Sequence, residues 1–128
     1  MNIYGLGIDI INIERFKNVL LKKKSLKKRI FTTKEITYCS KKKNNISCFA
    51  MRFAAKEAFS KALGTGISKG ISFNEIEISN NKIGKPSIKL KGVTLKIVQK
   101  ILKKRLFKIV LSISDDKPFA VASVILSN

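Results

Sequence analysis

The chain has 128 residues, the length of one domain, and 45% of them are apolar, which excludes a disordered basic tail. Lys and Arg number 27 against 8 Asp and Glu, so the formal charge of +19 indicates an anionic partner: nucleic acid, a phosphate-bearing small molecule or an acidic protein. Histidine is absent, which excludes Ser-His-Asp and Cys-His catalytic sites and His-ligated metals.

The first third of the chain predicts one strand followed by short helices. Residues 3–11 predict a buried strand with an apolar face (Tyr4, Leu6, Ile8, Ile10) and a nearly bare face that ends in a carboxylate (Ile3, Gly5, Gly7, Asp9). Asn12 is placed to cap a basic helix, and Thr32 or Thr33 to cap a short helix over residues 34–40. Residues 41–45 predict a polar loop.

The rest of the chain predicts a long helix, two hairpins and a further helix. The helix covers residues 46–63, is rich in Ala and is closed by Gly64-Thr65-Gly66. A hairpin of strands follows, then a helix whose apolar stripe carries Val93, Ile97, Ile101 and Leu102, and then a second hairpin (strands 72–79 and 87–91, helix after Gly92, strands 108–114 and 119–126). This order predicts a single α+β domain over residues 1–128.

The cysteines and the N-terminus predict a cytoplasmic location. Cys39 and Cys48 form no Cys-x-x-Cys pair and cannot complete a zinc site without histidine, so we expect reduced thiols. Gly5, Gly7 and Asp9 interrupt what would be a signal-peptide stretch, and no segment approaches the ~18 apolar residues of a membrane span.

Two of the eight acids stand among apolar or small residues. Asp9 ends the glycine-bearing face of the first strand, and Glu57 lies within Ala54-Ala55-Lys56-Glu57-Ala58. A carboxylate that is removed from water needs a cation or several hydrogen-bond donors. Together with phosphate oxygens, the two would suit Mg²⁺. A plain ion pair of Glu57 with Lys61, four residues later, is the alternative. The other glutamates, Glu14, Glu35, Glu75 and Glu77, have patterns typical of exposed positions.

Several features of the long helix and its end suit an anionic ligand. Phe53, Glu57 and Lys61 line one stripe of the helix, while Arg52 on the adjoining stripe offers a bidentate fork for phosphate. Gly64-Thr65-Gly66 could form a nest of backbone N–H groups, or simply an ordinary glycine cap. Gly5-Leu6-Gly7 lacks the rest of a dinucleotide fingerprint, and Gly84-Lys85-Pro86 is not a Walker motif.

These residues resemble one family. Gly7-Ile8-Asp9-Ile10, Ile13-Glu14-Arg15, the run from Arg52 to Ile67 and Gly84-Lys85-Pro86 resemble holo-[acyl-carrier-protein] synthases, the short bacterial 4′-phosphopantetheinyl transferases. The resemblance implies a fold in which an antiparallel sheet and helices surround one long central helix. It also implies transfer of phosphopantetheine from coenzyme A to a serine of apo-acyl carrier protein, with release of adenosine 3′,5′-bisphosphate, in fatty acid biosynthesis.

The resemblance also assigns roles to residues. Asp9 and Glu57 match the magnesium ligands and, with Lys61, the catalytic group. The residues expected to hold the nucleotide end of coenzyme A are Arg52, Phe53, Lys61, Gly64, Thr65, Gly66, Lys85 and Pro86. Arg15 and, with less support, Lys22 match the surface that docks the acidic carrier protein. The family implies a homotrimer with active sites at subunit boundaries.

One position departs from the family pattern. Asp115 stands where many relatives have His, and a carboxylate cannot donate to phosphate at neutral pH. Asp115 could instead accept from a ribose or adenine group, bind a metal-bound water or only shape the turn, and we favour the turn. The competing function is a basic nucleic-acid-binding module, which rests only on the charge of +19. The sequence has no stretch in which aromatic and basic residues alternate and no recognisable nucleic-acid-binding motif, so no specific nucleic-acid partner is expected.

Overall fold

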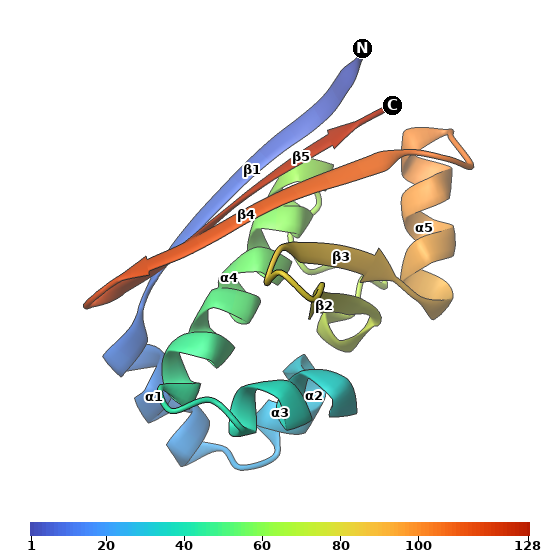
Figure 1. The fold of residues 1–128 in the computed structure, drawn as a ribbon. Helices are drawn as coiled ribbons and strands as arrows, with labels where there is room; N and C mark the ends of the chain where they lie inside the picture. Colours follow the sequence, from blue (N-terminus) through green and yellow to red (C-terminus); the bar gives the residue numbers. More distant parts are fainter.

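The computed structural model describes all residues 1–128 as one α+β domain (Figure 1). Its elements, in order, are β1 (Ile3–Asn12), α1 (Ile13–Lys22), α2 (Leu26–Ile30), α3 (Thr33–Ser40), α4 (Asn45–Leu63), a 3₁₀ turn (Phe73–Glu75), β2 (Ile76–Asn80), β3 (Pro86–Leu90), α5 (Gly92–Leu102), β4 (Lys108–Asp116) and β5 (Phe119–Ser127). The predicted elements are confirmed except at residues 72–75, where a 3₁₀ turn takes the place of the first half of the expected strand 72–79, and α2 is an addition. None of the helices has the length and apolar character needed to cross a bilayer.

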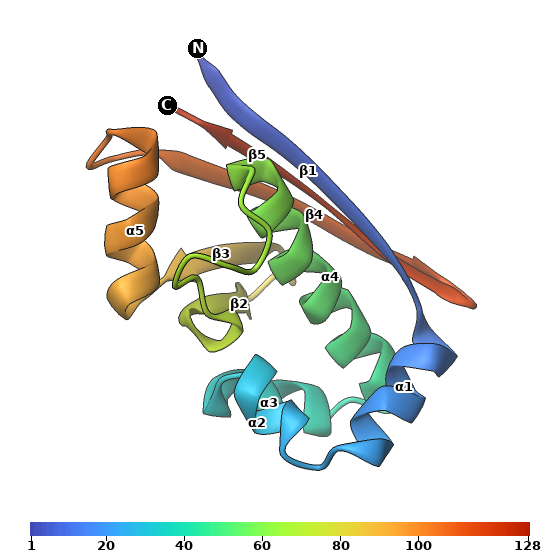
Figure 2. The same ribbon diagram turned by 180° about the vertical axis from the view of Figure 1, so that it is seen from behind.

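The long helix α4 lies at the centre, as the expected fold requires. On one side it packs against an antiparallel three-stranded sheet in the order β1-β5-β4. On the other side lie the β2–β3 hairpin, the helices α1, α2 and α3, and α5 beyond the hairpin (Figures 1 and 2). One core cluster joins the C-terminal half of α4 to the sheet, the hairpin and α5, and a second joins its N-terminal half to α1, α2 and α3.

Two glycines let β1 lie against the backbone of α4. A Cβ atom added at Gly5 would stand 1.8 Å from the carbonyl oxygen of Ala62, and one added at Gly7 would stand 1.9 Å from that of Ala58. No side chain fits in that space. The bare face of the predicted strand therefore faces α4, and this contact carries Asp9 to the surface of the helix.

The apolar face of β1 is exposed, so the expectation of a strand buried on that face is wrong. Leu6, Ile8 and Ile10 are 67%, 62% and 62% exposed. The register β1-β5-β4 aligns them with Ile125 and Val110, with Ser123 and Ser112, and with Val121 and Ser114. A shift in register between Ile3 and Gly5 turns Tyr4 toward the core instead. The outer face of the sheet is thus an uncovered, largely apolar surface.

A buried ion pair joins α4 to α2, α3, the 3₁₀ turn and β2. Lys56 Nζ donates to Glu35 Oε1 at 2.7 Å and to the carbonyl oxygens of Ile30 and Phe73, while Glu35 Oε2 accepts from the backbone N–H of Ile78. Both side chains are fully buried. Burial lowers the pKa of Lys56 to about 8. The expected exposure of Glu35 is therefore wrong, because the carboxylate that closes the Thr32 capping box also receives a lysine from a distant helix.

Glu77 is also buried, contrary to expectation. Its carboxylate accepts from Lys91 Nζ at 3.0 Å. Burial would raise the pKa of Glu77, but hydrogen bonds from Thr32 and Lys91, with the charge of Lys34, outweigh it and hold the pKa below its ordinary value.

The α5 stripe also differs from the prediction. Thr94 and Val98 are fully buried, whereas Val93 is 60% exposed. The pairing of Glu75 explains the shift, because its carboxylate accepts from the N–H and hydroxyl of Thr94 and turns that side inward.

The two cysteines form a disulfide, so the prediction of free thiols is wrong. Cys39 lies in the last turn of α3 and Cys48 in the first turn of α4, with their Cα atoms 5.5 Å apart. That separation lies within the range a disulfide spans. The α3–α4 turn, and not local spacing in the sequence, brings the two sulfurs together.

Candidate active site

Asp9, Glu57 and Lys61 come together where β1 crosses α4. Lys61 Nζ donates to Asp9 Oδ1 at 2.8 Å, so the lysine pairs across to the strand and not with Glu57 along its own helix. The close approach at Gly7 explains the contact, because Asp9 is the next residue on the face that meets α4. The Asp9 side chain is only 12% exposed, whereas that of Lys61 is 51% exposed.

The electrostatics of this cluster are those of two crowded carboxylates. Burial and the charge of Asp9 raise the pKa of Glu57, and the charge of Lys61 only partly offsets them. The hydrogen bond to Asp9 raises the pKa of Lys61. Two acids and a single ammonium share the site, so it has an unbalanced negative charge.

The second oxygen of Asp9 is the feature that points to a ligand. Asp9 Oδ2 is buried and has no hydrogen-bond partner, and a buried carboxylate oxygen without one is costly. A divalent cation would satisfy it and would relieve the repulsion from Glu57. The protein has no cluster of three or more His, Cys, Asp or Glu side chains that could hold a metal alone. Mg²⁺, which takes one or two carboxylates and fills its shell with water and phosphate oxygens, fits this pair.

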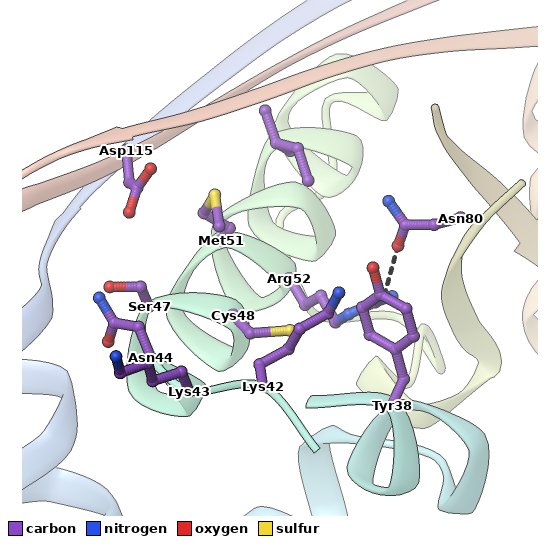
Figure 3. Close-up of a pocket in the computed structure, with 11 residues that line it drawn as sticks. Tyr38, Lys42, Lys43, Asn44, Ser47, Cys48, Met51, Arg52, Asn80 and Asp115 are labelled. Carbon is purple, nitrogen blue, oxygen red and sulfur yellow. Dashed lines mark hydrogen bonds between the residues drawn. The ribbon is translucent and has the colours of Figure 1, made fainter. Parts of the chain in front are cut away.

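A second polar site lies on a different side of α4. A cavity of about 330 Å³ opens between the α3–α4 turn, the start of α4, the hairpin and the end of β4 (Figure 3). Its lining residues are Tyr38, Lys42, Lys43, Asn44, Ser47, Cys48, Met51, Arg52, Asn80, Ile113 and Asp115. Ser47 is 3% exposed, and its hydroxyl has no hydrogen-bond partner. Three cations, Lys42, Lys43 and Arg52, and one carboxylate, Asp115, therefore line this cavity together with an unsatisfied hydroxyl.

Arg52 forms the inner wall of this cavity and secures the hairpin. Its guanidinium donates to the carbonyl oxygen of Ile78 and to Asn80 Oδ1, and it stacks 4.4 Å from the centre of the Tyr38 ring. Asn80 in turn donates to the carbonyl oxygen of Gly84 in the hairpin turn. Arg52 thus holds the turn that carries Lys85 and Pro86. Some of its N–H donors are already used in hydrogen bonds within the protein.

The structure places Asp115 in β4, paired with Ala120, and not in the turn. Its side chain lines the cavity on the side opposite Arg52 (Figure 3). Six further lining residues were not predicted from the sequence: Tyr38, Lys42, Lys43, Asn44, Ser47 and Asn80. Only the polarity of residues 41–45 hinted at them, and that polarity equally predicts a solvated loop.

Gly64-Thr65-Gly66 forms a helix cap, the second of the two alternatives that the sequence left open. The backbone N–H groups of all three residues donate to the carbonyl oxygen of Ser60, so the loop is a helix cap. Gly64 has a φ of 89°, the left-handed conformation of such a cap. Open space surrounds Gly64 and Gly66, since a Cβ added at either would meet no atom within 4 Å. A ligand could still pass over this backbone.

A third hollow, an apolar groove, adjoins the carboxylates. It has a volume of about 390 Å³, and β1, α1, α2 and α4 line it with Ile10, Ile11, Asn12, Arg15, Phe16, Val19, Leu26, Ile30, Phe53 and Phe73. Phe53 lies here, stacked on Phe16 at 4.9 Å between ring centres, one helical turn before Glu57. Arg15 stands at the rim, while Lys22 is exposed at the end of α1 and does not line the groove.

Comparisons with known proteins identify the family. A model described as the 4′-phosphopantetheinyl transferase superfamily matches residues 5–122. The chain belongs to this superfamily. Residues Asp9, Glu57, Arg52 and Lys85 all fall within the matched segment.

The relatives of this transferase share its length and fold. The holo-[acyl-carrier-protein] synthase of Geotalea daltonii is 46% identical over 125 residues, which are 97% of this chain and 98% of that protein. The crystal structure of the Neisseria meningitidis synthase superposes with a TM-score of 0.87 at 33% identity, covering 99% of this chain and 100% of that one. The Helicobacter pylori synthase, solved in complex with coenzyme A, has a TM-score of 0.81 at 35% identity, covering 95% and 99%. The expected family, fold and enzyme class are thus confirmed.

Proposed function

We propose that this transferase moves the 4′-phosphopantetheine arm of coenzyme A to a serine of an apo-acyl carrier protein, in a Mg²⁺-dependent reaction that releases adenosine 3′,5′-bisphosphate. The observation that carries the proposal is the buried, partnerless Oδ2 of Asp9 beside Glu57 and Lys61. The names of the relatives, and the coenzyme A bound to the Helicobacter pylori synthase, support the choice of substrates.

In the reaction, the carrier serine oxygen forms a bond to the phosphorus that bears pantetheine. The bond from that phosphorus to the bridging oxygen breaks, the nucleotide leaves as its 5′-phosphate, and the serine proton is lost to solvent. The partner supplies the nucleophile, so this chain needs none of its own. Its task is to position the diphosphate and to offset charge at the leaving oxygen.

Three side chains serve that task at the β1–α4 crossing. Asp9 and Glu57 would hold Mg²⁺, which supplies charge neutralisation on the diphosphate when bound. Lys61 keeps two further N–H donors free beyond its bond to Asp9 Oδ1, and half of its side chain is exposed. It can therefore donate to an oxygen of the leaving phosphate while it stays anchored to the strand.

We infer that the cavity beside Arg52 binds the phosphates at the nucleotide end. Lys42 and Arg52 supply positive charge there, and the hydroxyl of Ser47 supplies an unused donor. We infer that Lys85 and Pro86, on the hairpin that Arg52 secures, contact the same ligand. The open backbone at Gly64–Gly66 leaves room for the remainder of the ligand.

We infer that the two halves of this site come from different subunits. Arg52 and Glu57 are five residues apart on α4, so their side chains leave the helix roughly 140° apart. The uncovered outer face of the β1-β5-β4 sheet supports assembly, because monomeric proteins seldom expose contiguous apolar patches of this kind. We infer a homotrimer in which the cavity of one subunit faces the carboxylates of its neighbour.

We infer that the carrier protein docks over the apolar groove. The groove includes Phe53, one helical turn before Glu57, so a partner seated there would have its serine near the diphosphate. Arg15 at the rim and Lys22 at the end of α1 would attract an acidic carrier and mainly raise the association rate.

The test is to incubate the protein with coenzyme A, Mg²⁺ and an apo-carrier, and to measure the intact mass of the carrier. We expect a phosphopantetheine adduct, and a loss of rate of more than about 100-fold in Asp9→Asn and Glu57→Gln, since changes to groups that merely support metal ligands already cost roughly 10- to 100-fold. Asp116→Asn, in the exposed hairpin, is the matched control and should retain the rate.

Two outcomes would contradict the proposal. No adduct, while a known synthase modifies the same carrier, would refute the activity. Full activity in Asp9→Asn or Glu57→Gln would leave the activity standing and refute the site.

A further inference from the structure

We propose that Cys39 and Cys48 form a reversible thiol–disulfide site that orders the lysine-bearing turn of the Arg52 cavity and thereby tunes how tightly the cavity binds a phosphate-bearing ligand. The identity of that ligand as the nucleotide end of coenzyme A rests on the proposed function. The thiol chemistry does not.

The position of the disulfide couples it to the cavity. It joins the end of α3 to the start of α4 with a sequence separation of nine, so the intervening turn lies inside the covalent ring. Three residues of that turn, Lys42, Lys43 and Asn44, line the cavity, and so does Cys48 itself (Figure 3). Opening the ring therefore changes a wall of the site directly.

The two cysteines differ in their access to the cavity. Cys39 is fully buried, whereas Cys48 is 9% exposed and faces the cavity. Lys42, Lys43 and Arg52 surround the same cavity, and Cys48 lies near the positive end of α4. An attacking thiol must be accessible to its oxidant, so Cys48, which lines the cavity, is the attacking thiol and the fully buried Cys39 is the resolving one.

The redox step balances with a glutathione-type disulfide as oxidant. The Cys48 thiolate attacks one sulfur of the oxidant, forms a mixed disulfide and releases one reduced thiol. The Cys39 thiolate then attacks the Cys48 sulfur, forms the intramolecular disulfide and releases the second. Each protein thiol gives up one proton, and the two electrons pass to the oxidant. An excess of reduced glutathione runs the same steps backward.

Few other contacts hold the turn. Between its helices it has a backbone bond from Lys42 to the carbonyl oxygen of Cys39 at 3.0 Å, a long one from Cys48 to that of Asn44 at 3.4 Å, and the Lys42 ammonium 4.7 Å from the Tyr38 ring centre. In the reduced protein the lysines must be ordered when the ligand binds. Ordering one such side chain weakens affinity by roughly 2- to 10-fold.

The experiment equilibrates the full-length protein in mixtures of reduced and oxidised glutathione, blocks free thiols with N-ethylmaleimide and measures the intact mass. Amide hydrogen exchange in residues 41–44 and calorimetric binding of adenosine 3′,5′-bisphosphate are measured on the same samples. We expect the disulfide to form reversibly, the turn amides to be more protected when oxidised, and the affinity to fall roughly 2- to 10-fold on reduction. Cys39→Ala and Cys48→Ala should bind like the reduced protein, whatever the glutathione ratio.

Each possible result decides a separate point. If folded wild-type protein alkylates at both cysteines in oxidised glutathione, the thiol–disulfide site is refuted. If the disulfide forms but neither amide protection nor affinity changes, the coupling to the cavity is refuted. If the disulfide protects the turn but adenosine 3′,5′-bisphosphate binds in neither state, the redox site stands and the nucleotide assignment of the proposed function fails.

Discussion

Replacing Gly7 with Ala would push the strand that carries Asp9 away from α4. The new Cβ would lie 1.9 Å from the carbonyl oxygen of Ala58, while ordinary contacts begin at 3.4 Å, so the two backbones must separate by about 1.5 Å. Neither contact atom belongs to a flexible side chain, because the next neighbour is the backbone nitrogen of Ala62. Such overpacking costs roughly 1–3 kcal/mol of stability.

The larger effect should fall on catalysis. A shift of 1.5 Å exceeds the length over which the 2.8 Å bond between Lys61 and Asp9 can persist. A misplacement of about 1 Å at a reacting centre costs on the order of 100-fold in rate. We therefore expect Gly7→Ala to lower kcat for carrier modification by about 100-fold, measured by intact mass, with stability measured by urea unfolding.

The control separates lost stability from lost geometry. Val98→Ala removes a fully buried side chain on α5, away from the β1–α4 crossing, and should lose a comparable 1–3 kcal/mol or so while keeping kcat. Wild-type kcat in Gly7→Ala, or an equal fall in both variants, would refute the argument that backbone contact positions Asp9.

Three further changes test the rest of the structure. Lys56→Met leaves Glu35 charged and buried, and should cost about 3–5 kcal/mol by urea unfolding; the double variant with Glu35→Gln should lose less than the two single losses added together, and strict additivity would contradict the pairing. The pKa of Glu77 lies below its ordinary value of 4.5 in the folded protein, so the unfolded chain takes up a proton first as the pH falls below that value, and the free energy of unfolding declines. Unfolding curves of Glu77→Gln should lack this part of the decline. If the free energy of unfolding of Glu77→Gln depended on pH as in the wild type, Glu77 would not be its cause. Ile8→Asp places a charge on the uncovered sheet face and should give monomers by light scattering; a trimer of unchanged mass would locate the interface elsewhere.

Locally encoded features could be predicted from the sequence. The Asn12 cap, whose side chain accepts from the N–H of Arg15, and the glycine end of α4 depend on residues within a few positions of one another. The sequence also grouped Asp9 with Glu57, because both acids stand among apolar or small residues, and in the structure they lie close enough for the charge of Asp9 to raise the pKa of Glu57.

Features made by distant partners could not be predicted. Alternation in β1 separates its two faces but does not distinguish a face that meets a core from one that awaits another subunit. Glu35 looked exposed because its partner Lys56 comes from a helix 21 residues away. The Arg52 cavity collects Lys42, Asn80 and Asp115 from three elements, and nothing in the sequence links those residues.

Because α4 belongs to both core clusters, neither half of the molecule has an interior of its own. Unfolding of the α1–α3 region would remove the apolar contacts on one side of α4. It would also leave the Lys56 ammonium without Glu35, among apolar neighbours, and so destabilise the packing of α4 against the sheet. We expect one cooperative transition, and amides in the middle of α4 that exchange with solvent only when the entire domain opens.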